Sequence, residues 1–297
     1  MKRIISVILA LTMVFALCGC KGDSQQGSFV FTKENYPKMG GSLAALPLGE
    51  ALTANALGIE RDEASSMLVF EGSTTDNYEA LVDGTFDIIL AYEPSGEALA
   101  YAEEKGVKLE FETIGLDALV FITGKENPVE NLTTQEIKDI YTGKTTRWSE
   151  VGGNDQKILA FQRNKDSGSQ TLFDKLINLG DDLMKPQSDY IVGSMIGLLE
   201  AISGYNGTDE ALGYTVYYYL TNMEASTLAT SKLISVDGVM PSNETIANGD
   251  YKLVNEFYVV MRADEAQDSP TRILFDWICS SQGREIAENE NYVVPNK

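Results

Sequence analysis

Short apolar runs that alternate with stretches of helical periodicity limit the fold of this 297-residue chain more than any other feature. Residues 87–91 form one apolar run and residues 111–123 a longer one, whereas apolar side chains recur at helical spacing over residues 43–57 and 77–83. Strands that alternate with helices are typical of an α/β fold with mainly parallel sheets. Ligands of such folds bind beyond the carboxyl ends of the strands, so a site is expected in the loops there.

The same periodicity predicts elements elsewhere in the chain. Expected strands cover residues 67–70 and 251–261, and expected helices cover residues 214–223 and 270–288. Thr133 and Glu136 have the spacing of a capping box, which predicts that a helix begins there. The chain is long enough for one large domain or two lobes of ordinary size.

The stretch from Arg163 to Thr171 places an arginine four residues before a Ser-Gly-Ser step. That step predicts the start of a helix over residues 170–179, with Gly180 ending it. The first turn of a helix has unpaired backbone N–H groups at the positive end of the helix dipole, and a guanidinium group beside it would complete a cradle for a small anion. An ordinary capped helix with Arg163 on the surface explains this stretch equally well.

Three other junctions between a loop and a helix have hydroxyl-bearing or acidic residues. Gly40-Gly41-Ser42 precedes the first expected helix, and Ser73-Thr74-Thr75 precedes the next. Tyr92-Glu93-Pro94-Ser95 follows the expected strand at residues 87–91. These junctions occur where an α/β fold binds its ligand.

The N-terminus predicts export. Lys2 and Arg3 precede an apolar run that is too short for a membrane-spanning helix, so residues 1–19 are interpreted as a signal peptide. Leu17-Cys18-Gly19-Cys20 resembles the bacterial lipobox, which implies a lipid anchor on Cys20; a plain secretory signal is the alternative. The polar residues that follow, up to residue 36, are expected to form a tether.

The charge of the chain excludes several classes of function. With 44 acidic residues against 23 lysines and arginines, the net charge is −21, which disfavours nucleic acid as a partner. The absence of histidine removes the commonest general base and the commonest transition-metal ligand. We therefore expect no catalytic residue, no metal site and no cofactor, and a surface phosphoesterase stays only a minor alternative.

Six short motifs in order carry a resemblance to a known family. They are Asp117-Ala118-Leu119-Val120-Phe121, Asn127-Pro128-Val129-Glu130-Asn131-Leu132-Thr133, Ile140-Tyr141-Thr142-Gly143-Lys144 with Trp148, Arg163 with Ser167-Gly168-Ser169, Leu212-Gly213-Tyr214, and Asp237-Gly238-Val239-Met240-Pro241. With these motifs the chain resembles the phosphate-binding lipoproteins, the substrate-binding proteins of phosphate ABC transporters, from about residue 40 to the C-terminus.

The resemblance implies a two-lobed type II periplasmic-binding fold, α/β in class, with two mixed sheets flanked by helices and joined by two crossover strands. The expected organisation is a signal peptide at 1–19, a lipidated tether at 20–36, lobe one at 37–116 plus 257–297, and lobe two at 117–256. The implied function is that of a monomeric receptor on the outer face of the cytoplasmic membrane. It would bind inorganic phosphate and deliver it to the membrane subunits of an ABC permease.

The resemblance also implies a set of ligand-binding residues. Arg163, Ser167, Gly168 and Ser169 would bind phosphate from lobe two. From lobe one, the resemblance implies a hydroxyl donor in the Ser73-Thr74-Thr75 loop, with Thr75 favoured by spacing over Thr74. It also implies an acceptor for the proton of the ligand at Glu93, where the family usually has aspartate, and donors in the first loop at Ser42 and Leu43. The first loop lacks the threonine that is common in the family, since Ala45 and Leu46 precede Pro47. Another oxyanion or a small phosphorylated solute therefore stays open as the ligand.

Overall fold

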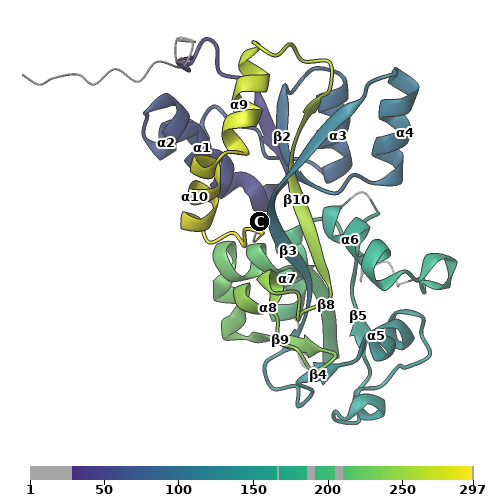
Figure 1. Cartoon of the computed structure of the whole chain (residues 1–297). Helices are drawn as coiled ribbons and strands as arrows, with labels where there is room; N and C mark the ends of the chain where they lie inside the picture. The colour runs from purple at the N-terminus through teal and green to yellow at the C-terminus, as the bar shows by residue number, and fades with distance from the viewer. Residues whose placement is uncertain (1–28, 166, 186–190, 205–209, 296–297) are drawn as a thin grey trace, which may run out of the picture. The chain divides into compact units, whose positions relative to one another are not determined.

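Two long strands, β3 (Leu109–Gly124) and β10 (Val254–Arg262), form the centre of the fold (Figure 1). The structure is a computed structural model that describes residues 29–165, 167–185, 191–204 and 210–295. The chain divides into two compact units, Met1–Val30 and Phe31–Lys297, and the second holds all elements described below. The predicted signal peptide, the lipidation at Cys20 and the first part of the tether lie outside the described residues. No helix in the described part of the chain is long and apolar enough to cross a membrane.

Lobe one is built on a mixed sheet in the order β1-β2-β10-β3. Strands β1 and β2 are parallel, and β10 runs antiparallel to both β2 and the first half of β3. The other strands are β1 (Met39–Gly41) and β2 (Ile88–Tyr92), and the helices are α1 (Leu46–Leu57), α2 (Arg61–Ser65), α3 (Thr74–Val82), α4 (Gly96–Lys105), α9 (Pro270–Ile278) and α10 (Ser281–Asn289).

Lobe two uses the second half of β3, which pairs antiparallel with β8 and β9. Strand β5 is parallel to β8 and β4 is parallel to β9, while β6 and β7 form a separate parallel pair. The strands are β4 (Asn131–Leu132), β5 (Leu159–Ala160), β6 (Gln162–Arg163), β7 (Ile191–Val192), β8 (Ala211–Val216) and β9 (Ser231–Val236), and the helices are α5 (Thr134–Tyr141), α6 (Gly168–Ile177), α7 (Met195–Gly204) and α8 (Asn243–Ala247).

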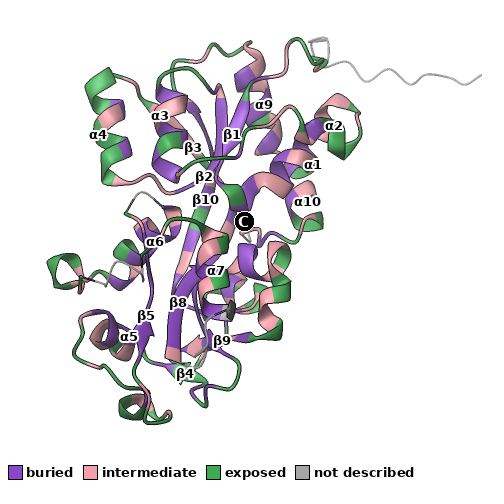
Figure 2. Ribbon diagram, turned by 180° about the vertical axis from the view of Figure 1, so that it is seen from behind, coloured by how far each residue is buried: buried purple, intermediate pink, exposed green. Residues whose placement is uncertain are grey.

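Most strand residues are buried and the helices expose one face, which confirms the predicted α/β class with helices flanking the sheets (Figure 2). Along β3, residues 118–122 are fully buried where the strand leaves the first sheet and enters the second. Because β3 is shared by both sheets and β10 begins beside its middle, where Val254 pairs with Ala118, these two strands connect the lobes (Figure 1). The exact boundaries between the two lobes stay a prediction.

Local sequence explains how the helices near the cavity begin. Ser73 caps α3 in a capping box with Asp76, and the predicted capping box of Thr133 with Glu136 is confirmed at the start of α5. Ser167 caps α6 by accepting a hydrogen bond from the backbone N–H of Gln170 at 3.2 Å. Helix α6 therefore begins two residues before the prediction, and Asn178 in a left-handed conformation, rather than Gly180, ends it.

Three predicted elements differ from the structure. Residues 67–70 form no strand, because Val69 makes only an isolated bridge to Gly40 and is 47% exposed. The helix predicted over residues 214–223 begins at residue 217, because Tyr214 belongs to strand β8, whose six residues are all buried beside β3. Sheet pairing overrides the helical pattern only at its start, and residues 217–223 are helical as predicted. The long C-terminal helix is broken into α9 and α10, since a Cβ at Gly283 would lie 2.0 Å from the carbonyl oxygen of Ile278 and the two helices meet closely there.

Candidate anion-binding site

A cavity of about 500 Å³ lies where loops of lobe one meet the start of α6 in lobe two. Both lobes contribute to its wall, as the fold class predicts for a ligand site at strand ends. The residues that line it are Ser42, Leu43, Phe70, Glu71, Gly72, Ser73, Thr74, Asp76, Tyr92, Arg163, Asn164, Ser167, Gly168, Ser169, Gly193, Ser194, Met195 and Val216.

Arg163 brings a buried positive charge to this cavity. Its side chain is fixed at two atoms: Nε donates to the carbonyl oxygen of Val192 at 3.0 Å, and Nη1 donates to Oγ of Ser169 at 3.1 Å. The residue is only 6% exposed, and no carboxylate of the described residues forms an ion pair with it. Burial lowers the pKa of the guanidinium to about 10, so the group keeps its charge at neutral pH. A buried cation without a carboxylate partner favours an anionic ligand.

The start of α6 lies beside this guanidinium. Ser167, Gly168 and Ser169 line the cavity, and Ser167 is the residue that caps the helix. Backbone N–H groups of a first helical turn have no acceptor within the helix and lie at the positive end of its dipole. Together with Arg163 they have the arrangement expected of the predicted anion cradle, and binding of an anion there stays a prediction. The alternative of a surface arginine is wrong because Arg163 is buried.

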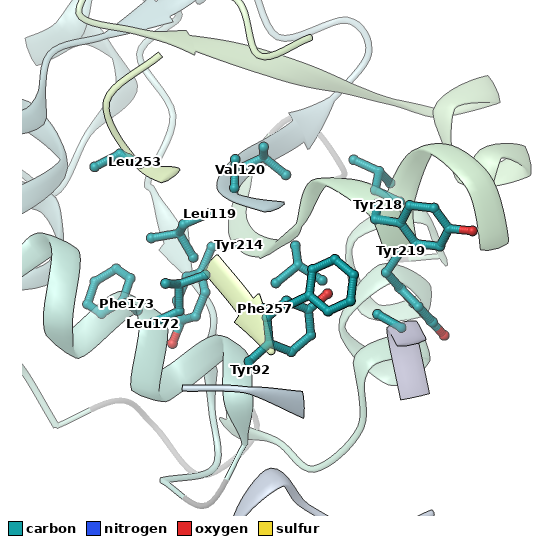
Figure 3. Packing of buried hydrophobic residues seen from close by; sticks show 14 of the residues in the cluster. Tyr92, Leu119, Val120, Leu172, Phe173, Tyr214, Tyr218, Tyr219, Leu253 and Phe257 are labelled. Carbon is teal, nitrogen blue, oxygen red and sulfur yellow. The ribbon is translucent and has the colours of Figure 1, made fainter. Parts of the chain in front are cut away.

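The cradle is supported from behind by aromatic packing. The backbone N–H of Arg163 is shared between Oη of Tyr214 at 3.1 Å and Oε1 of Gln170 at 3.3 Å. Tyr214 stacks on Phe173 of α6 with ring centroids 4.5 Å apart (Figure 3). Burial raises the pKa of the Tyr214 hydroxyl, so it stays protonated and can also donate to Gln170. The packing of α6 against β8 thus fixes the position of Arg163.

Lobe one contributes hydroxyl groups to the opposite wall. Ser42 and Thr74 are each 6% exposed, and their hydroxyl oxygens lie 3.4 Å apart. The backbone N–H of Ser42 donates to the carbonyl oxygen of Leu90 at 2.9 Å, which holds the first loop against β2. The next residue, Leu43, also lines the cavity. The first loop therefore reaches the site without the threonine that the family commonly has.

Gly168 is the point where the two walls touch. A Cβ built on it would lie 2.6 Å from Oγ1 of Thr74 and 3.7 Å from Cδ2 of Tyr92. Only a glycine lets the start of α6 approach lobe one this closely. The Ser-Gly-Ser order of the cradle thus serves both the anion site and the contact between the lobes.

Two of the predicted ligand-binding residues do not reach the cavity wall. The hydroxyl of Thr75 lies 2.9 Å from that of Ser95, within the loops of lobe one. The carboxylate of Glu93 forms an ion pair with Lys175 of α6. Neither residue lines the cavity. Direct contact of Thr75 or Glu93 with an anion stays a prediction from the sequence alone.

The structure adds residues that the sequence reasoning missed. Ser194 lines the cavity, and its Oγ accepts a hydrogen bond from the backbone N–H of Gly197 at 3.0 Å near the start of α7. Gly193-Ser194 before a helix repeats the pattern found at Ser42 and Ser167, so this signal was present in the sequence. Glu71 and Asp76 also place carboxylates in the cavity wall. The pattern of hydroxyl residues at helix starts does not predict them.

Comparison with known proteins shows what family this fold and site belong to. The family model described as the PBP superfamily domain matches residues 43–281. The chain belongs to the PBP superfamily. The matched range begins at Leu43, directly after Ser42 of the first loop, and includes the residues of the cradle and both crossover strands.

Individual relatives are similar over most of the chain. Phosphate-binding protein PstS of Borreliella burgdorferi is 26% identical, with 99% of each chain covered. The protein of the same name from Bacillus subtilis is 27% identical over 83% of this chain and 78% of its own. A Clostridium perfringens protein described as a phosphate ABC transporter substrate-binding protein, with bound phosphate in its crystal structure, has a TM-score of 0.69 and 26% identity over 89% of this chain and all of that one.

Proposed function

We propose that this protein is a receptor that binds inorganic phosphate in the cavity between its lobes and delivers it to an ABC permease. The buried guanidinium of Arg163 beside the start of α6 carries this proposal, because it is a fixed positive site in a chain of net charge −21. Relatives named phosphate-binding protein PstS, and the phosphate-bound structure from Clostridium perfringens, support it.

In this proposal the two lobes hold one anion between them. From lobe two, Arg163 donates a guanidinium fork, while Ser167, Gly168 and Ser169 offer hydroxyl and backbone N–H groups. From lobe one, Ser42, Leu43 and Thr74 offer further donors. Hinge motion about β3 and β10 would open and close the cavity, as in other two-lobed binding proteins.

The cellular setting is part of the same proposal. A lipid on Cys20 would tether an exported monomer to the outer face of the cytoplasmic membrane, where a permease could accept its ligand. The expected lobes, 37–116 plus 257–297 and 117–256, would each present one wall of the cavity. The function is binding rather than catalysis, in keeping with relatives that are named for binding or transport.

Calorimetry on protein freed of bound anion tests the proposal. We expect heat of binding for one phosphate per chain at neutral pH, and much weaker binding of sulfate. A monoprotonated phosphate can donate to the carboxylates of Glu71 or Asp76 in the cavity wall, whereas sulfate carries no proton to donate. Absence of heat with phosphate would contradict the proposal, and tighter binding of sulfate would assign the site to another oxyanion.

The size of the cavity favours a second candidate, a small phosphorylated solute. At about 500 Å³ the cavity falls in the range of sites for whole organic ligands, and Leu43, Phe70 and Met195 give it an apolar part. If this candidate is right, glycerol phosphate should displace phosphate at equal or lower concentration in a competition titration. If inorganic phosphate is the ligand, glycerol phosphate should compete at least about tenfold less well, which corresponds to one or two unfavourable polar contacts.

A further inference from the structure

Lys175 lies on α6, about two helical turns beyond the cradle, and connects three separate parts of the fold. Its Nζ forms an ion pair with the carboxylate of Glu93, just after β2 in lobe one. The same Nζ donates to Oδ1 of Asn255 on the crossover strand β10 at 3.1 Å. None of these three residues lines the large cavity.

We propose that Lys175 is a positioning residue for anion binding, and that with Glu93 and Asn255 it forms an interlobe latch that holds α6, and so the cradle, against lobe one. The inference rests on the proposed function, because anion affinity is its main readout. It gives Glu93 a role that differs from reading the proton of the ligand.

The position of Lys175 on α6 explains how the latch acts on the cradle. A helix is stiff over two turns, so fixing Lys175 also fixes Gly168 and Ser169 at the start of the same helix. Gly168 is the residue that already touches Thr74 of lobe one. The two contacts together hold α6 against lobe one at its first residue and in its last turn.

The latch also reaches the connection between the lobes. Asn255 is 3% exposed and lies opposite Asp117 in the pairing of β10 with β3. A rotation about these strands that moves α6 away from β2 would separate Lys175 from Glu93. The ion pair would then be made only in the closed form and would shift the equilibrium toward that form.

A second interlobe ion pair supplies a matched control. Lys165, just before the cradle, lies 3.7 Å from the carboxylate of Glu97 at the start of α4. These side chains are 81% and 61% exposed, compared with 46% for Lys175 and 37% for Glu93. Water and salt therefore screen the outer pair more strongly than the pair of Lys175 and Glu93.

The test compares Lys175→Met with Lys165→Met by calorimetric titration with phosphate. We expect Lys175→Met to raise Kd about tenfold, since it removes an ion pair and a charged hydrogen bond to a buried group. Lys165→Met should change Kd by at most about twofold. Lys175→Arg should restore most of the affinity, and the exchange Glu93→Lys with Lys175→Glu should restore part of it.

Glu93→Gln separates the latch from direct contact with the ligand. A latch predicts that this variant weakens phosphate and sulfate binding by the same factor, so their ratio of Kd values stays constant. A change in that ratio, or equal effects of the Lys175 and Lys165 variants, would overturn the inference.

A further readout does not depend on the ligand. Small-angle scattering of the phosphate-free protein should show a larger radius of gyration for Lys175→Met than for Lys165→Met, because the closed form is less populated. Equal radii would count against the latch. If the unaltered protein binds no phosphate, the proposed function fails, while the scattering comparison still decides about the latch.

Discussion

Replacing Arg163 with methionine should lower phosphate affinity by about 100-fold or more while leaving the phosphate-free protein as stable as before. Removing one partner of a buried charge pair costs about 3–5 kcal/mol, which sets the scale of the loss in binding. Without phosphate, however, Arg163 is a desolvated cation that no carboxylate of the described residues neutralises, as its lowered pKa of about 10 reflects. Methionine removes that unfavourable burial and fills similar volume.

Calorimetric titration and urea unfolding of the same samples test this prediction. The free energy of unfolding of phosphate-free Arg163→Met should lie within about 1 kcal/mol of the parent protein or above it, even though its hydrogen bonds to Val192 and Ser169 are lost. Arg147→Met is the control, since that arginine is 47% exposed and pairs with Asp155. It should bind phosphate normally. Retained affinity in Arg163→Met would place the anion elsewhere.

The part of the site that could be predicted from sequence is the part made by local rules. A hydroxyl residue before a helix caps it, and the unpaired N–H groups follow from helix geometry alone. The junctions at Ser42, at Ser73-Thr74-Thr75 and at Ser167 to Ser169 were found as hydroxyl residues at the starts of helices, and all of these residues except Thr75 line the cavity. Ser73 and Ser167 are helix caps, whereas Ser42 makes no capping hydrogen bond. Ser194 obeys the same rule and could have been found.

Contacts between distant segments could not be predicted in this way. The sequence places Glu93 at a strand end beside the other junctions, but nothing local shows that Lys175, on another lobe, lies within reach of it. The same limit explains Tyr214, which local periodicity assigns to a helix and pairing with β3 places in a strand. The break between α9 and α10 depends on how closely Gly283 approaches Ile278, which is again a property of packing.

Asp117 is another buried charged residue of this protein, and it lies on the strand that both lobes share. It lies on β3, where Oδ2 accepts a hydrogen bond from the hydroxyl of Tyr92 at 2.6 Å. Oδ1 accepts from the backbone N–H groups of Ala118 at 2.7 Å and Tyr218 at 3.0 Å. Burial raises the pKa of this carboxyl to about 6, although the hydrogen bonds act in the opposite direction.

This raised pKa predicts how stability depends on pH. The folded protein holds the proton of Asp117 more tightly than the unfolded chain does, so the contribution is fully present below the unfolded pKa near 3.9 and is lost as pH rises through about 6. Asparagine can keep the same geometry, with its oxygen accepting from the two N–H groups and its amide donating to Tyr92. Asp117→Asn should therefore gain stability relative to the parent protein as pH rises.

Urea unfolding of both proteins across this pH range measures the effect. From about pH 4.5 to about pH 7.5, the difference in unfolding free energy should move by about 2 kcal/mol in favour of Asp117→Asn, because two units of pKa correspond to nearly 3 kcal/mol over the full titration. Asp264→Asn, at an exposed position of lobe one, is the control for removal of a carboxylate. A flat difference for Asp117→Asn would mean that its carboxyl titrates normally. A change of the Asp117→Asn difference with pH would show that the buried charge of Asp117, where β3 and β10 connect the lobes, lowers the free energy of unfolding. Arg163 is the corresponding buried charge in the cavity.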